Sequence, residues 1–263
     1  LELCNKLSKI TNIWNEIKDY PSVKLLLKFN ENAKLFLSSY LFRFEPTEIN
    51  EEIVSDICEC LLRLFTILEL SDVGYSSSKF KTFLLSENIK LVDKNVSIET
   101  IKNDFNEHIN KNWPAKNVEE GILDYDKNLL VFLNEYIYSK SKGIKFDFAE
   151  NINVEHIMPA SGKNIAIIQQ DAGITDKEEF MRIVNKLGNK ILLEEDINKS
   201  ISNEWFKTKK QSSIKDKTGY KDSKYAIARA LTEYPNDTWT KEDIDKATNN
   251  KAVERIVKYI FNK

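Results

Sequence analysis

The stretch Val154-Glu155-His156-Ile157-Met158-Pro159 decides the fold of the second half of this chain. Polar and apolar residues alternate from Lys145 to Met158, which predicts extended chain, and Pro159 ends it because proline cannot donate to a strand ladder. A second short apolar run, residues 190–193, follows Gly188 and predicts another strand. These are the two strands that the sequence predicts, in a background of helices.

Apolar residues at helical spacing lie on both sides of these strands, and glycine is nearly absent from the first half. The pattern predicts a mainly α protein with a helical domain over residues 1–145 and a second domain over residues 146–263. In the second domain, Asn198 is expected in a turn and Asn203 as a helix N-cap. The predicted helices cover residues 1–20, 48–70, 80–91, 98–110, 128–139, 176–186, 203–211, 222–233 and 241–261.

Charge is distributed unevenly along the 263 residues. The net charge is −2, but residues 1–150 hold 19 basic against 24 acidic residues, whereas residues 151–263 hold 20 against 17. Within the second part, residues 199–229 carry nine basic and three acidic residues. Such an excess can attract a polyanion, although charge alone favours a solvated lysine-rich face.

Cysteine content and hydropathy indicate a cellular compartment. The three cysteines do not have the spacing of a disulfide framework or a zinc knuckle, and no apolar run reaches the ~18 residues of a membrane span. We therefore expect a soluble protein of the reducing cytoplasm. Residue 1 is Leu without a leader pattern after it, so we expect a fragment of a longer protein.

The chain has two histidines, His108 and His156. His108 lies on the polar side of a predicted helix, which favours a structural role. His156 follows Glu155 at the end of a predicted strand, where a surface role and a catalytic role are equally consistent with the local residues. Asn189 comes after Gly188 and Asn198 follows nine residues later, then Ser202-Asn203-Glu204-Trp205-Phe206-Lys207-Thr208-Lys209.

Taken in this order, the motifs resemble an HNH (His-Me finger) nuclease, in which a histidine and two helper residues assemble on a ββα unit. Glu-His-Ile-x-Pro, Leu-Gly-Asn, the later Asn and Ser-Asn-x-x-Phe-x-x-Lys are similar to the C-terminal nuclease domain of the GmrSD-type modification-dependent restriction enzymes. The resemblance covers about residues 127–263 and implies a ββα-metal core wrapped by helices.

The resemblance implies metal-dependent hydrolysis of DNA phosphodiester bonds. A neutral imidazole can take a proton from water, which makes His156 the expected general base. Mg²⁺ or Mn²⁺ would neutralise negative charge, with Glu155 and Asn198 as oxygen ligands. Asn189 would hold the loop or orient His156. Contacts to DNA phosphates are expected from Lys199, Lys207, Lys209 and Lys210.

Several alternatives stay open. Asn189 can be a turn residue with positive φ, and Asn198 can cap a helix. Trp205, Phe206 and Trp239 are expected in the core and not as platforms for base stacking.

The resemblance implies double-stranded DNA, including modified phage DNA, as substrate. It also implies an upstream ParB-like, nucleotide-using domain, with a homodimer left open. The competing functions are a DNA-binding or interaction module with an inactive nuclease core and an RNA-cleaving toxin.

Overall fold

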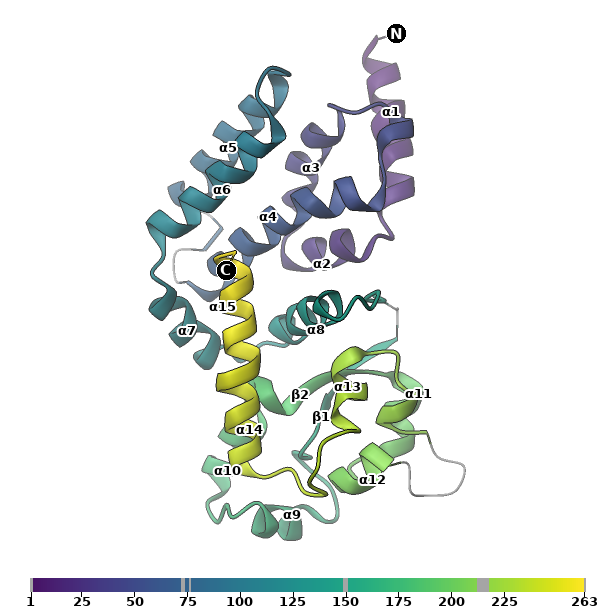
Figure 1. The fold of residues 1–263 in the computed structure, drawn as a ribbon, viewed down its shortest axis with the longest axis vertical. Coiled ribbons are helices and arrows are strands. Elements are labelled where there is room, and N and C mark those ends of the chain that lie inside the picture. Colours follow the sequence, from purple (N-terminus) through teal and green to yellow (C-terminus); the bar gives the residue numbers. More distant parts are fainter. Residues whose placement is uncertain (1, 72–73, 76, 149–150, 212–217, 263) are drawn as a thin grey trace. The chain divides into compact units, whose positions relative to one another are not determined.

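The computed structural model describes residues 2–71, 74–75, 77–148, 151–211 and 218–262 (Figure 1). The chain forms two compact units, one of residues 1–121 with 258–263 and one of residues 122–257. The division falls within helix α7 (Ala115–Asp124). Helix α8 (Leu129–Ser141), which precedes the strands, therefore belongs to the second unit. Within the described part of the chain, no helix is both long and apolar enough to cross a membrane.

The prediction of a mainly α protein is confirmed. The first unit contains α1 (Glu2–Ile17), α2 (Pro21–Phe29), α3 (Ala33–Leu41), α4 (Glu51–Leu70), α5 (Ser78–Val92), α6 (Ile98–Asn112) and most of α7 (Ala115–Asp124). The second contains α8 (Leu129–Ser141), β1 (Ile152–His156), α9 (Ile165–Asp171), α10 (Lys177–Val184), η2 (Leu187–Asn189), β2 (Lys190–Glu194), α11 (Glu195–Ile201), α12 (Phe206–Gln211), η3 (Tyr220–Asp222), α13 (Ala226–Leu231), α14 (Lys241–Ala247), the π-helical turn η4 (Thr248–Val253) and the start of α15 (Glu254–Ile260).

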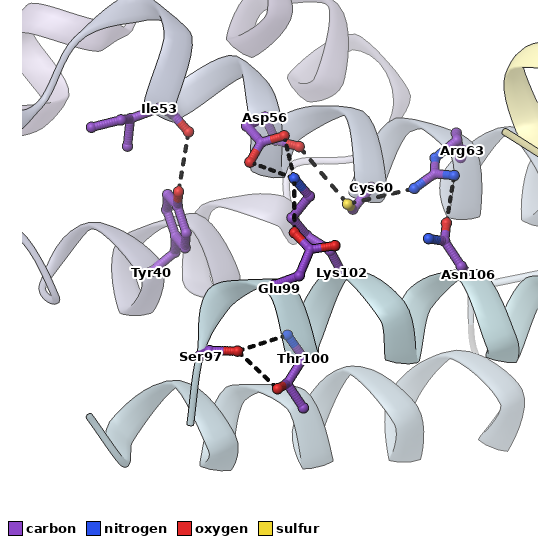
Figure 2. Close-up of polar contacts among 10 residues, drawn as sticks. All are labelled: Tyr40, Ile53, Asp56, Cys60, Arg63, Ser97, Glu99, Thr100, Lys102 and Asn106. Carbon is purple, nitrogen blue, oxygen red and sulfur yellow. Dashed lines mark hydrogen bonds and ion pairs between the residues drawn. The ribbon is translucent and has the colours of Figure 1, made fainter. Parts of the chain in front are cut away.

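Helix α4 is the central element of the first unit. Its apolar residues are buried along nearly its whole length, and the Asn50 side chain caps it by accepting from the Ile53 amide at 3.0 Å. Polar contacts join it to α6: Lys102 pairs with Asp56, and Arg63 donates to the Asn106 side chain at 2.7 Å (Figure 2). The first unit is therefore a helical bundle built around the buried helix α4.

The second unit is built on a two-stranded antiparallel hairpin. Its register pairs His156 with Lys190, Glu155 with Ile191 and Ile152 with Glu194. Directly opposed residues lie on the same face, and neighbours in a strand lie on opposite faces. His156 and Lys190 therefore share one face, whereas Glu155 lies on the other.

Helices pack around this hairpin. Helix α11 follows β2 directly and contacts both strands, while α8 and α13 pack against β2. Gly188 lies so close to the start of η4 that a Cβ atom there would approach the Thr248 amide nitrogen to 2.3 Å. This close contact explains why glycine stands at the turn into β2.

Two local expectations for this unit are wrong. Asn198 lies inside α11 and not in a turn, and α12 begins at Phe206, so Asn203 is not its N-cap. Residues 195–201 place only two side chains, Ile197 and Ile201, in the core. Two buried residues are too few for helical periodicity to be recognised from sequence.

Candidate active site

His156 ends β1 and has one ring nitrogen without a partner. Its Nε2 atom is shielded from solvent and forms no hydrogen bond within the described residues. The ring forms a hydrogen bond with the side chain of Asn185, the residue after α10. The Asn185 amide nitrogen donates to the Met181 carbonyl at 2.8 Å, which leaves the amide oxygen to accept from the imidazole.

This arrangement selects one tautomer of the imidazole. Since Nε2 has no partner among the described residues, Nδ1 is the ring nitrogen that can face Asn185, and a proton on Nδ1 suits that contact. Nε2 is then left with a free lone pair. Burial lowers the pKa of His156, and the nearby positive charge of Lys190 lowers it further. The ring is therefore neutral near pH 7 and can accept a proton at Nε2.

The side chain of Asn189 fixes the backbone just after His156. Asn189 is fully buried; its oxygen accepts from the Met158 amide at 2.8 Å, and its nitrogen donates to the carbonyls of Met158 and Val184 at 2.9 and 2.8 Å. Its own carbonyl accepts from the Ile157 amide at 2.9 Å. Asn189 does not have a positive φ, so the alternative of a simple turn residue does not apply. The residue joins the end of β1 to the turn before β2.

Glu155 and Lys209 pair with each other in the interior. Lys209 Nζ forms an ion pair with Glu155 Oε1 and also donates to the carbonyls of His156 at 2.8 Å and Ile157 at 3.3 Å. The Tyr220 hydroxyl donates to the same carboxylate oxygen at 3.3 Å. Burial raises the pKa of Glu155 and lowers that of Lys209, and the pairing opposes both shifts. The pair holds the backbone of the His156 strand from the face opposite the imidazole.

The role of Lys209 as a DNA contact needs correction. Its side chain is completely buried, so it cannot reach a DNA phosphate in this arrangement. Lys210 is also buried and donates to the carbonyls of Tyr234 and Asn236, both at 2.7 Å. The basic run of the sequence does not show that these two ammonium groups point inward. Lys199 and Lys207 are exposed and pair with Glu195 and Asp237.

The predicted metal ligands are in different situations. The Glu155 carboxylate does not fit a metal ligand here, because it is buried and bound to Lys209 and Tyr220 on the face opposite His156. Asn198 is partly exposed on α11, and no hydrogen bond joins its amide to another described side chain. Within the described residues, His, Cys, Asp and Glu do not form a group of three or more that could hold a metal ion.

Two residues that the sequence analysis does not select belong to this site. Asn185 and Lys190 both act on the His156 ring, one by a hydrogen bond and the other by its charge. Lys190 was recognisable only as the first residue of the second predicted strand; its place opposite His156 was not, because the first predicted strand runs on to Met158. Asn185 was not recognisable, because the sequence at the end of a helix does not predict which side chain it will contact.

Of the three aromatic residues expected in the core, Phe206 and Trp239 lie there, whereas Trp205 is only partly buried. Phe206 and Trp239 are 4% and 6% exposed, with ring centroids 5.3 Å apart, and Tyr234 packs against both.

The comparisons with known proteins place this geometry in a family. No curated protein and no solved structure matches the chain. The family model of the GmrSD restriction endonucleases, C-terminal domain, matches residues 68–250 and thus includes both strands, His156, Asn189 and Asn198. The matched region is more than half of the sequence. The chain therefore belongs to the GmrSD restriction endonuclease C-terminal domain family, whose activity is that of a nuclease acting on DNA.

Proposed function

We propose that the chain is an HNH-type, divalent-metal-dependent DNA endonuclease with His156 as general base. The observation that carries the proposal is the unpartnered Nε2 atom of a neutral imidazole at the end of β1. A buried ring nitrogen without a partner is unfavourable in a purely structural role, whereas a general base needs a ring nitrogen with a free lone pair. The order of β1, β2 and α11 agrees with a ββα unit.

In this reaction, Nε2 takes a proton from a water molecule while the water oxygen bonds to phosphorus. The bond between phosphorus and the leaving sugar oxygen then breaks, and that oxygen takes a proton from solvent. Asn185 holds the imidazole with its lone pair free, and Asn189 fixes the backbone that carries it. Divalent-metal dependence is part of the proposal because a cation would neutralise charge on the phosphate. Asn198 is the predicted oxygen ligand that remains available, since Glu155 is engaged by Lys209.

The biological role is proposed from the family. We propose cleavage of foreign, modified phage DNA, with base modification recognised through a ParB-like, nucleotide-using partner domain. A homodimer would allow both strands to be cut. Lys199 and Lys207 are the predicted phosphate contacts that stay accessible.

Incubation of plasmid DNA, modified or unmodified, with the protein in Mg²⁺, Mn²⁺ or EDTA tests the function. The proposal predicts nicked or linear DNA with either metal and intact plasmid with EDTA. An RNA transcript of the same sequence is the matched second substrate. Cleavage of RNA alone would establish the toxin alternative, and DNA binding without cleavage in any metal would establish the inactive module.

A further inference from the structure

A cavity of about 120 Å³ lies in the second unit, where β2 meets α8, α13 and the continuous α14–η4–α15 segment. Its wall is largely apolar and includes Tyr234 and Trp239. Three cations line it, Lys190, Lys251 and Arg255, and no carboxylate does among the described residues. We refer to it as the cationic pocket.

Arg255 is held in this pocket without an acidic partner. Its guanidinium donates to the Asn134 side chain at 2.5 Å and lies 4.6 Å from the centre of the Tyr138 ring. No described carboxylate forms an ion pair with Arg255 or Lys251, and the nearby Glu135 is occupied by the Ala226 and Ile227 amides. The charge of Glu135 acts on Arg255 without a direct ion pair, so an anion bound beside the partly buried guanidinium would stabilise it further.

Trp239 gives a second, independent indication of a ligand. Its ring is 6% exposed, and its Nε1 atom is buried without a hydrogen-bond partner among the described residues. Buried indole N–H groups ordinarily have an acceptor. The residues that line the pocket thus include one with an unused hydrogen-bond donor and cations without a direct ion pair to a described carboxylate.

The cationic pocket adjoins the candidate active site. Ile157, which follows His156, lines it, and so does Lys190, which is the cross-strand partner of His156. The η4 turn beside it is a π-helix, a distortion that occurs often at functional sites. A chain of DNA that presents a phosphodiester to His156 would therefore pass the pocket.

We propose that the cationic pocket binds one nucleotide of the DNA strand beside the scissile phosphodiester. Its phosphate contacts Lys251 and Arg255, and its base and sugar pack on the wall formed by Tyr234 and Trp239. Aromatic walls stack on any base, and Arg and Lys neutralise the phosphate, so both ligand parts match the wall that meets them. This inference rests on the proposed nuclease function.

The test measures binding of the full chain to a short fluorescein-labelled DNA duplex in EDTA over a series of salt concentrations. Lys251→Ala removes an exposed cation that lines the pocket, and Lys246→Ala removes an equally exposed cation on α14 that does not. Loss of one phosphate contact reduces the slope of log K against log salt by about 0.9. We expect this change for Lys251→Ala and an unchanged slope for Lys246→Ala.

A second variant probes the pocket without removing any of its contacts. Ala230 is exposed and lines the pocket, so Ala230→Glu adds a negative charge there without disturbing the core. It should weaken duplex binding while the circular dichroism melting curve stays that of wild type.

Two results would overturn the pocket proposal: equal slopes for Lys251→Ala and Lys246→Ala, or wild-type affinity for Ala230→Glu. A wild-type chain that does not bind the duplex would also overturn it. Because binding is measured without metal, its outcome is separate from the plasmid cleavage that tests the nuclease function.

Discussion

The two histidine side chains of this protein lie in opposite situations. His108 stacks on Phe83 with ring centroids 3.9 Å apart, and its Nε2 atom bonds to the Lys79 carbonyl at 2.8 Å. The Asn185 side chain acts on the His156 ring, and the Nε2 atom of that ring has no partner among the described residues. One ring is satisfied by the fold and the other retains a free lone pair, which is why His156 alone is assigned a catalytic role.

The pH dependence of cleavage tests the surroundings of His156. A general base works in its neutral form, so the rate falls as pH drops through its pKa. Burial and the charge of Lys190 lower this pKa below the ordinary 6.5, and the charge of Lys209 lowers it slightly, against the Asn185 hydrogen bond. We therefore expect the single-turnover cleavage rate to decline only below pH 6.5. Lys190→Met should move the decline to higher pH, because it removes a like charge.

The matched control for this profile is Lys199→Met, which removes an exposed, ion-paired cation. It should leave the position of the acidic decline unchanged. A decline at the same pH in wild type and Lys190→Met would contradict the assignment of the titrating group to His156.

The ion pair between Glu155 and Lys209 can be tested by a double-mutant cycle. Lys209→Met leaves a buried carboxylate without its cation and should lower the free energy of unfolding by about 3–5 kcal/mol. Glu155→Gln combined with Lys209→Met should cost clearly less than the sum of the single changes, since neither partner is then left charged. Urea unfolding measures all three variants.

Lys207→Met is the control, because Lys207 lies on the same helix and is exposed. It should change stability by less than about 1 kcal/mol. If Lys209→Met behaves like Lys207→Met, or if the two single changes are additive, the buried pair described here does not exist.

At the level of elements, the hairpin shows what sequence can and cannot predict. Both strands were predictable, because each contains apolar residues. Pro159 follows the first strand and Gly188 precedes the second. The direction of each side chain follows from alternation once the register is known. The partner of Glu155 was not predictable, since Lys209 is 54 residues away and only packing brings α12 to that face.

Helix α11 illustrates the opposite limit. It has seven residues and follows β2 without a break, so no turn or cap marks its start. The long helices α4 and α6 have a side-chain cap at their start, with twelve buried residues in α4 and three at a spacing of four residues in α6, and both were predicted to within three residues.

The connection between the end of β1 and the turn before β2 depends on the side chain of Asn189. Asn189→Ala would leave the Met158 amide and the carbonyls of Met158 and Val184 buried without their partner. Each such loss costs about 1–3 kcal/mol, so we expect the free energy of unfolding to fall by roughly 3 kcal/mol or more. Asn189→Asp keeps the acceptor for the Met158 amide but places a buried carboxylate against two carbonyl oxygens, so in urea unfolding it should be at least as destabilising as Asn189→Ala. If Asn189→Ala were as stable as wild type, Asn189 would not hold the end of β1 to the turn before β2.

At the scale of the whole molecule, the family match and the geometry both indicate the region around β1 and β2. The matched residues 68–250 contain the hairpin with His156 and most of the cationic pocket, although Lys251, Ala252 and Arg255 lie beyond them. Overall charge would not have located this site, since the net charge is −2 and two of the most conspicuous lysines point into the core. Only the burial of each side chain in the structure shows which of the cations are accessible.

The central claim is that His156 is the general base of a DNA endonuclease. The most direct measurement is the single-turnover rate of DNA cleavage by full-length His156→Ala, compared with His108→Ala and wild type, after circular dichroism shows that all three are folded. We predict a loss of about 10²–10⁴-fold for His156→Ala and a rate near wild type for His108→Ala. A His156→Ala rate within about tenfold of wild type, below the loss expected for a general base, would contradict the claim.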